Sequence, residues 1–238
     1  MILRETLFRG TPLALVEQHH HVLIPWTRLA RRTGRRYHAV TLDHHTDVLP
    51  AFGRSAVRGT FDFHSEEAVL SALALLRHDE HIDWALRADV LASARILSHE
   101  SFTPCAHPAM TVRCDSVWPE TQEILNGSPR AVFAAEQVLE TEYLRRGIPE
   151  IPEPLILDVD LDNFLCARAL HPRDASYFLE LAERAELITV SLERDWVRCL
   201  RFRGETISAE SLFEDLLQLG KCAGNRGVPG GRFFILSD

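Results

Sequence analysis

The sequence predicts a three-layer α/β/α fold with a mostly parallel central sheet, built as a single domain over residues 1–238. Apolar, β-prone segments alternate with segments of helical periodicity, which is the pattern of strands joined by crossover helices. One segment, Leu155–Asp160, opens with an apolar run, as expected for a strand that is covered on both faces. No shift in composition, internal repeat or low-complexity linker divides the chain, so one domain is the simpler organisation.

Turn and cap signals delimit the elements of the first half of the chain. Pro25 is tolerated in a first helical turn, and Gly34 is a typical helix stop. Ser65 is a good N-cap, and two acidic residues follow it in the first turn. Residues 48–64 show little periodicity and are expected to form a loop. Strands are predicted at Leu13–Glu17, Tyr37–Leu42 and Met110–Cys114, and helices at Pro25–Thr33, Ser65–Leu76 and Trp84–Leu97.

The second half of the chain begins with the clearest helix signal. Ser128 supplies a cap, Pro129 the first helical position and Gly147 the stop. The strand Leu155–Asp160 follows this helix along the chain. The remaining predictions are a helix at Asp174–Ala185, a strand at Leu187–Leu192, a helix at Ser208–Leu219 closed by Gly220, and an edge strand at Arg232–Leu236.

The composition is that of an acidic globular protein. The 238 residues are 46% hydrophobic and carry a formal net charge of −8, which argues against nucleic acid as a partner. Five scattered cysteines without a CxxC pair are typical of reduced thiols in the cytosol. No signal-peptide pattern and no membrane-spanning apolar run is present. We expect a cytoplasmic protein that binds neither nucleic acid nor a membrane, and the oligomeric state stays open, a homo-oligomer included.

The segment Leu42–Asp47 holds two carboxylates and a histidine at alternate positions, directly after an apolar strand. Side chains two apart in an extended segment project to the same side. Asp43, His45 and Asp47 are therefore expected to converge, while His44 turns away. Taken alone, such a motif is also compatible with a surface loop whose acids cap helices.

A second acidic cluster, Asp158, Asp160 and Asp162, follows another apolar strand. Three acids at one strand end repel one another unless a cation or solvent offsets their charge. Both clusters fall at the carboxyl ends of strands, where open parallel sheets bind ligands. Carboxylates with imidazole and no cysteine favour manganese, then iron or zinc, and five or six ligands suit a two-metal site. One or two of the consecutive residues His19, His20 and His21 are expected to supply a further imidazole.

These two motifs resemble the signature motifs of the ureohydrolase superfamily, which contains arginases and agmatinases. The fuller pattern is similar to a branch of that fold that includes peptide arginases. Members of this branch convert arginine side chains of ribosomally made peptides into ornithine and release urea. The resemblance implies an arginase/deacetylase-like fold, and an arginine-containing precursor peptide as partner. The matching segments are Val16–His19, Leu42–Asp47 and Leu157–Asp162.

The resemblance also implies roles for individual residues. Asp47 would accept a proton from the attacking water and pass it to the departing amine. Glu193 would pair with the substrate guanidinium, although a surface glutamate beside Arg194 is an equally good reading of that position. His64 would be a proton shuttle. A di-manganese centre is implied, with His19, Asp43, Asp47 and Asp158 around one ion and Asp43, His45, Asp158 and Asp160 around the other.

The sequence departs from the arginase pattern in ways that bear on the substrate. Asp162 follows Asp160 by two residues, where arginases have a spacing of three and then a proline. The polar loop with which arginases hold the amino and carboxylate groups of free arginine has no counterpart in residues 48–64, which favours peptide-bound arginine. The alternatives are a ureohydrolase of free arginine or agmatine, a single-zinc deacetylase-like amidohydrolase, and a peptide-binding module without activity.

Overall fold

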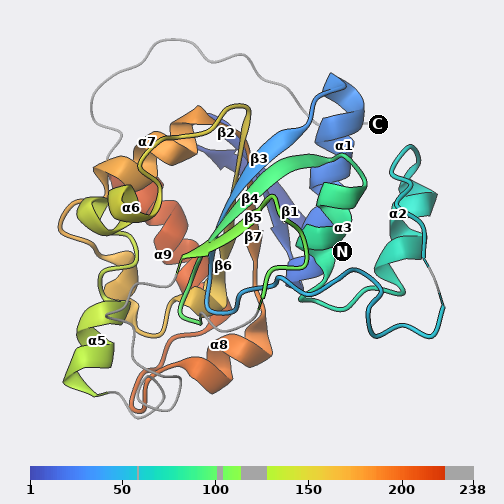
Figure 1. Cartoon of the computed structure of the whole chain (residues 1–238). Helices are drawn as coiled ribbons and strands as arrows, with labels where there is room; N and C mark the ends of the chain where they lie inside the picture. The colour runs from blue at the N-terminus through green and yellow to red at the C-terminus, as the bar shows by residue number, and fades with distance from the viewer. Residues whose placement is uncertain (58, 101–103, 114–127, 223–238) are drawn as a thin grey trace.

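The computed structural model describes residues 1–57, 59–100, 104–113 and 128–222, and a twisted sheet runs through the middle of them (Figure 1). Its strand order is β1-β2-β7-β6-β3-β4-β5. Neighbouring strands pair in parallel, except that β1 lies antiparallel to β2 at one edge. The strands are β1 (Ile2–Phe8), β2 (Thr11–Val16), β3 (Tyr37–Asp43), β4 (Leu91–Ser98), β5 (Met110–Arg113), β6 (Leu155–Asp160) and β7 (Ala185–Ser191).

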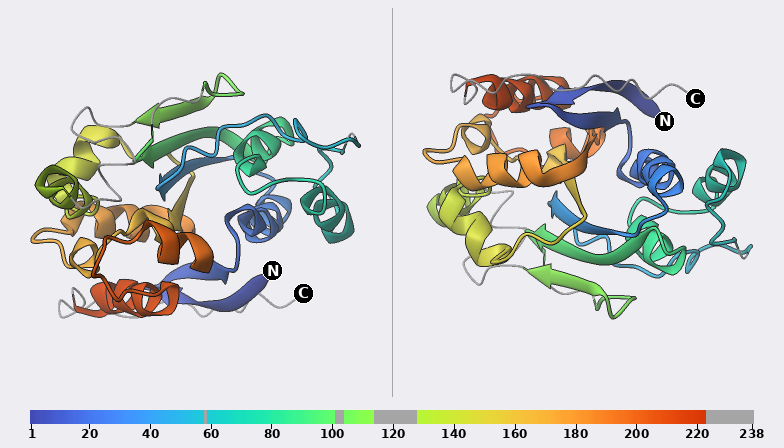
Figure 2. Two further views of the ribbon diagram at one scale, coloured as in Figure 1. Left: turned by 90° about the horizontal axis from the view of Figure 1, so that it is seen from below. Right: turned by 90° about the horizontal axis from the view of Figure 1, so that it is seen from above.

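Helices cover both faces of the sheet, which confirms the predicted three-layer arrangement (Figure 2). One layer contains the helices α1 (Leu23–Thr33), α2 (Glu66–Leu73) and α3 (His81–Arg87). The opposite layer contains α5 (Pro129–Ala135), α6 (Thr141–Gly147), α7 (Ser176–Arg184) and α9 (Ala209–Cys222). The remaining elements are η1 (His19–Val22), η2 (Leu161–Asn163), η3 (Ala167–Leu170) and α8 (Arg194–Leu200).

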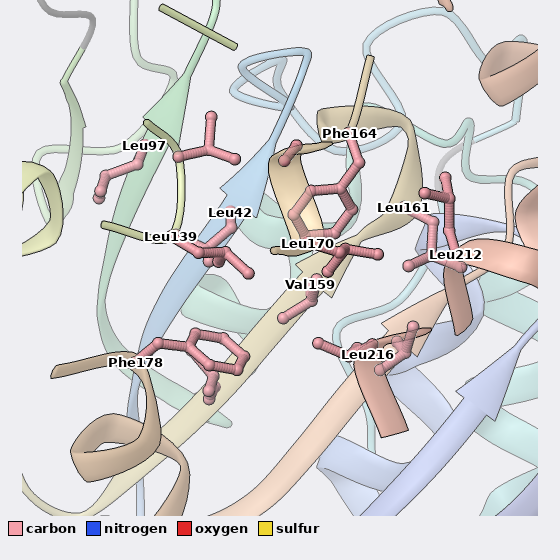
Figure 3. Packing of buried hydrophobic residues seen from close by; sticks show 14 of the residues in the cluster. Leu42, Leu97, Leu139, Val159, Leu161, Phe164, Leu170, Phe178, Leu212 and Leu216 are labelled. Atoms are coloured by element: carbon pink, nitrogen blue, oxygen red, sulfur yellow. The ribbon is translucent and has the colours of Figure 1, made fainter. Parts of the chain in front are cut away.

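Each face of the sheet has its own apolar core, and β6 contributes to both. Val159 belongs to a buried cluster that includes Phe178 of α7 and Leu216 of α9 (Figure 3). Ile156, on the other face of the same strand, belongs to a second cluster with Trp26 of α1. Every residue of β6 is buried, as the sequence pattern of this strand predicts.

The helix predicted at Trp84–Leu97 is wrong. The segment divides into the end of α3 and the strand β4, and Asp89 between them has a left-handed backbone with φ of 60°. The sequence of β4 is rich in alanine and serine, so its periodicity does not separate strand from helix. Pairing decides the outcome, because β4 lies between β3 and β5 and bonds to both.

The helix predicted after Ser128 and the helix predicted before Gly220 also differ from the structure. Ser128 caps α5 as expected by accepting from the Ala131 N–H, but the segment up to Gly147 forms two helices instead of one. Glu140 breaks it, because its backbone is extended and its carboxylate accepts from the N–H groups of Arg173 and Asp174. The predicted stop at Gly220 is wrong as well. α9 continues to Cys222, and Gly220 instead allows close packing, since a Cβ there would lie 2.6 Å from Phe8 Cε2.

Several elements lie beyond what the sequence patterns indicated. The strand β1 and the helix α8 were not predicted. Cys114 and the edge strand predicted at Arg232–Leu236 lie outside the described residues. Among the described residues, no helix combines the length and apolar character needed to cross a membrane.

The strand order creates one reversal point, between β3 and β6. From β3 the chain proceeds outward to β4 and β5, whereas from β6 it proceeds to β7 on the other side. Open parallel sheets bind ligands in the crevice at such a point, beyond the carboxyl ends of the strands. β3 ends at Asp43 and β6 at Asp160, so the two acidic clusters meet there.

Replacing Leu157, which is fully buried in β6, by alanine is expected to lower the free energy of unfolding by about 3 kcal/mol, because a cavity remains in the central strand. Leu70→Ala is the matched control, since Leu70 is 49% exposed on α2, and it should change stability by less than about 0.5 kcal/mol. Chemical denaturation measures both values. Equal losses for the two variants would contradict the central position of β6.

Candidate metal centre

The candidate centre lies at the reversal point of the sheet, where side chains from three strand ends meet. Asp43 ends β3, Asp160 ends β6, and His19 opens η1 shortly after β2. Because β3 and β6 pair in parallel, their last residues leave the sheet at the same edge. All three side chains are buried, with His19 only 1% exposed. The structure thus brings together residues that the sequence placed in separate motifs.

One group of ligand atoms surrounds Nδ1 of His19, and we call it the first focus. Asp47 Oδ2 lies 2.8 Å from this nitrogen, Asp160 Oδ2 lies 3.2 Å away and Asp43 Oδ2 lies 3.4 Å away. The ligand atoms of His19, Asp43 and Asp160 also lie within 4.8 Å of one another. Three carboxylates and one imidazole therefore converge from η1, β3, β6 and the segment after β3.

A second group of ligand atoms surrounds Nδ1 of His45, and we call it the second focus. Asp162 Oδ2 lies 3.1 Å from this nitrogen and Asp43 Oδ1 lies 3.9 Å away. The two oxygens of Asp43 thus face different foci, Oδ2 the first and Oδ1 the second. A carboxylate that spans two neighbouring sets of ligands is the arrangement of a binuclear metal site.

The positions of the acids on β6 differ from those that the resemblance implies. Asp158 approaches His19 from the other side of the ring, with Oδ2 2.8 Å from Nε2. Asp158 is two residues from the strand end, about 6–7 Å deeper in the sheet than Asp160. Asp162 reaches the second focus, whereas Asp158 reaches neither group of ligand atoms around an Nδ1 nitrogen. Asp162 is directed there because η2 turns the chain back and the Asp162 N–H donates a hydrogen bond to Asp160 Oδ1. Asp160 therefore faces the first focus and Asp162 the second.

The segment after β3 reaches the foci by a bend and not by the extended alternation that the sequence suggested. The strand ends at Asp43, and Asp47 has a left-handed backbone with φ of 48°. Asp43 and Asp47 reach the first focus, and Asp43 and His45 reach the second, so the three side chains do not meet at one point. The expectation that His44 turns away is wrong, because its ring lies beside His45, and ligand atoms of His44, His45 and Glu100 lie within 4.8 Å of one another. His44 is completely buried, and its ring centroid lies 4.9 Å from that of His45 and 5.0 Å from that of His99.

Glu193 lies at the edge of the centre, directly before α8. Its Oε1 accepts from the His19 backbone N–H at 2.6 Å, so it is held against the first focus. Its backbone is left-handed, with φ of 40° and ψ of 48°. Non-glycine residues adopt this conformation at a cost of order 1–3 kcal/mol, and such strain clusters at functional sites. Glu193 is therefore more than a surface residue beside Arg194.

His64 is placed away from the centre. Its ring stacks on that of Phe63, and it lines a surface hollow with Arg36 and Asp89. Those two residues lie near the starts of β3 and β4, so His64 is at the opposite end of the sheet from Asp43. The structure does not bring His64 to the residues that it was expected to serve.

His81, which the sequence reasoning missed, lies behind the first focus. Its ring centroid is 4.4 Å from that of His19, and its Nδ1 lies 3.7 Å from Asp47 Oδ2. Burial lowers the pKa of His81 well below its usual value, so the ring is neutral. Nδ1 then donates to the His78 carbonyl at 2.7 Å. The sequence offered one indication of this residue, because His78 and His81 lie three residues apart just before and at the start of α3. The predicted helix began at Trp84 and so did not include them.

The charges of the centre are strongly coupled. Burial opposes the charged form of His19, but the carboxylates of Asp158 and Asp160 outweigh it and raise the pKa of this imidazole well above its usual value. Burial opposes the charged form of His45 too, and Asp162 raises the pKa of His45 to about 10. Both rings are therefore protonated on both nitrogens and positively charged at neutral pH in the metal-free protein, and a bound cation would displace the proton of the nitrogen that it contacts.

The donor set fits divalent cations. Within the described part of the chain, several buried atoms of the foci have no hydrogen-bond partner, although unpartnered buried polar atoms are rare in folded proteins. Carboxylate oxygens with imidazole nitrogens are ligands typical of manganese, iron and zinc. The unpartnered atoms are His19 Nδ1, Asp43 Oδ2, Asp47 Oδ1 and Asp162 Oδ2.

Comparisons with known proteins give a distant similarity of fold. No family model and no curated protein matches the sequence. Solved structures that match include a proclavaminate amidino hydrolase from Streptomyces clavuligerus, with 12% identity and a TM-score of 0.44. Another is a hypothetical agmatinase from Burkholderia thailandensis, with 12% identity and a TM-score of 0.45. The alignments cover 89% and 90% of this chain but only 61% and 60% of theirs, so the chain spans about three-fifths of their length.

Manganese is expected to stabilise the protein, by about 2.7 kcal/mol per site at a concentration one hundred times the Kd. His45→Ala should reduce this stabilisation, because it removes the imidazole of the second focus. His64→Ala is the matched control and should leave it unchanged, since His64 is exposed and distant. Thermal unfolding with and without Mn²⁺ measures the difference. An equal manganese response in both variants would contradict the assignment of the second focus.

Proposed function

We propose that this protein is a hydrolase of guanidino groups that uses two divalent cations, and that its substrate is arginine within a peptide. The observation that carries the proposal is the division of Asp43 between two foci, each with its own imidazole. When bound, such ions activate water at neutral pH and polarise the group under attack. His19, Asp43, Asp47 and Asp160 would hold one ion, and Asp43, His45 and Asp162 the other.

Asp47 is the residue best placed to move a proton. Its Oδ2 faces His19, while its Oδ1 is buried and has no hydrogen-bond partner among the described residues. This free oxygen would accept a proton from the attacking water and give it to the departing amine. The imidazole of His81 lies behind Asp47, with its Nδ1 3.7 Å from Asp47 Oδ2. The left-handed backbone of Asp47 fixes this orientation.

Glu193 and Trp196 are the residues best placed to recognise the guanidinium. Glu193 is fixed through Oε1 by the His19 N–H, so its carboxylate is set beside the first focus. Trp196 lies one turn further along α8 and is 38% exposed. Its ring centroid is 4.8 Å from that of His45 and 6.3 Å from that of His78. An anion and an aromatic face together suit a planar cation.

The proposed substrate is a peptide and not free arginine, because residues 48–64 show no evident counterpart of the polar loop with which arginases hold the amino and carboxylate groups of free arginine. Arg54, the first cation of this segment, is already paired with Asp79 and Glu80. The proposed biological role is the conversion of arginine to ornithine in a ribosomally made precursor peptide. Manganese is the proposed metal, because carboxylates outnumber imidazoles in the foci.

The proposed activity is tested by incubating the Mn²⁺-loaded protein with arginine-containing peptides and measuring urea and ornithine. Urea release in step with ornithine formation is the expected outcome. Free arginine, agmatine and an acetyl-lysine peptide are the comparison substrates. Faster turnover of free arginine or agmatine would assign a small-molecule ureohydrolase. Acetate release without urea would assign a deacetylase, and no turnover of any substrate would refute the enzymatic proposal.

Glu193→Gln is expected to lower kcat/KM on the peptide about 100-fold, because the guanidinium loses its counter-charge. Glutamine retains an oxygen that accepts from the His19 N–H, so manganese binding should not change. Asp195→Asn is the matched control on the same helix, since the Asp195 side chain is 87% exposed. Steady-state kinetics and calorimetric manganese titration are measured on both. Unchanged kcat/KM in Glu193→Gln would exclude Glu193 as the guanidinium partner.

A further inference from the structure

Four buried side chains form a continuous line of hydrogen bonds behind the first focus. Trp26 Nε1 donates to Thr189 Oγ1 at 3.1 Å, and Thr189 Oγ1 donates to Asp158 Oδ1 at 2.6 Å. The other oxygen of Asp158 lies 2.8 Å from His19 Nε2. Trp26, Thr189 and Asp158 are fully buried, and they come from α1, β7 and β6. The line therefore ties three separate elements to one imidazole.

The direction of every proton in this line is fixed by its end members. An indole nitrogen only donates, so the Thr189 hydroxyl accepts from Trp26 and must direct its own proton to Asp158. An ionised carboxylate only accepts, so the proton shared with His19 resides on Nε2. Nδ1 of His19, which faces the first focus, is then the nitrogen that is left to bind a cation.

Asp158 differs in its hydrogen bonding from three of the four acids of the two foci. Both of its oxygens have hydrogen-bond partners, whereas Asp43, Asp47 and Asp162 each keep a buried oxygen without one. Asp158 is also on the far side of the His19 ring from Asp47 and Asp160. Its contacts are those of a carboxylate that orients a metal-binding histidine and makes it more basic.

We infer that Asp158 is a positioning residue and not a metal ligand, and that Thr189 and Trp26 hold it in position. This inference rests on the proposed two-metal centre and refines its ligand set. It assigns the metal-binding position on β6 to Asp160, which ends the strand and faces the first focus, and leaves Asp158 to select the tautomer of His19. Carboxylates two residues apart on one strand face would then have different functions.

The test is a calorimetric titration of Mn²⁺ alone into the chelator-stripped full chain. Asp158→Asn is expected to bind two ions with about 10- to 100-fold weaker affinity at the first focus, as found for outer-shell partners of metal ligands. Asp160→Asn is the matched control on the same strand and should lose at least one ion at any concentration. Loss of an ion in Asp158→Asn with the full number retained in Asp160→Asn would overturn the inference, as would equal losses in both.

A second pair of variants keeps the inference testable if Asp158→Asn does not fold. Thr189→Val preserves shape but removes the hydroxyl, and it should weaken manganese binding about tenfold, the low end of the range for outer-shell groups. Thr189→Ser restores the hydroxyl and should return the affinity to within about twofold of the original. Unfolding of the metal-free variants separates a loss of stability from a loss of affinity. Unchanged manganese affinity in Thr189→Val, or no recovery in Thr189→Ser, would overturn the role of the line.

The outcomes are distinguishable from those of the activity test. A chain that binds two ions, responds to Asp158→Asn as expected and releases no urea would refute the guanidino hydrolase and support this inference. Urea release by the unmodified chain, together with loss of an ion in Asp158→Asn, would support the guanidino hydrolase and overturn this inference.

Discussion

The accumulation of negative charge at the end of the sheet is the constraint on which the other features of this structure depend. Ionised carboxylates are costly to bury unless cations or hydrogen-bond donors offset them. His19 is the residue that meets this need, because its two ring nitrogens contact carboxylates from β3, β6 and the segment after β3. His45 does the same for one further acid. The acids concerned, all at most 3% exposed, are Asp43, Asp47, Asp158, Asp160 and Asp162.

The alternation of side chains along β6 makes such a site compatible with a stable core. Leu157 and Val159 face one helical layer, and Ile156, Asp158 and Asp160 face the other. The face of β6 that carries Ile156 changes from apolar to acidic within two residues, whereas the face that carries Leu157 and Val159 stays apolar. The centre is therefore placed on a rigid, fully buried strand, which holds ligand atoms more accurately than a surface loop would.

The sequence was sufficient for the layers, the parallel sheet and the meeting of the two acidic motifs, because these follow from local periodicity and from the position of strand ends. The approach of His45 and Asp47 to the foci depends on a bend after β3, which the alternating pattern does not report. The sequence was insufficient where strand pairing determines the secondary structure. β4 has a sequence that suits a helix, and only its neighbours make it a strand. The exchange of Asp158 for Asp162 depends on where β6 stops and η2 turns, which no alternating pattern reports. His64 shows that proximity in sequence to a motif does not imply proximity in space.

The position of β2 in the sheet has a consequence for biosynthesis. Among the strands, β2 pairs only with β1 and β7, and β7 is the last strand of the described chain to be translated. The hairpin of β1 and β2, which His19 follows, therefore cannot pair with β7 until the ribosome has released residues up to about Ser191. Any binding of a cation at the first focus would then follow the pairing of β2 with β7. A chain that lacks β7 would carry Asp43 and Asp47 without the imidazole of His19 held beside them.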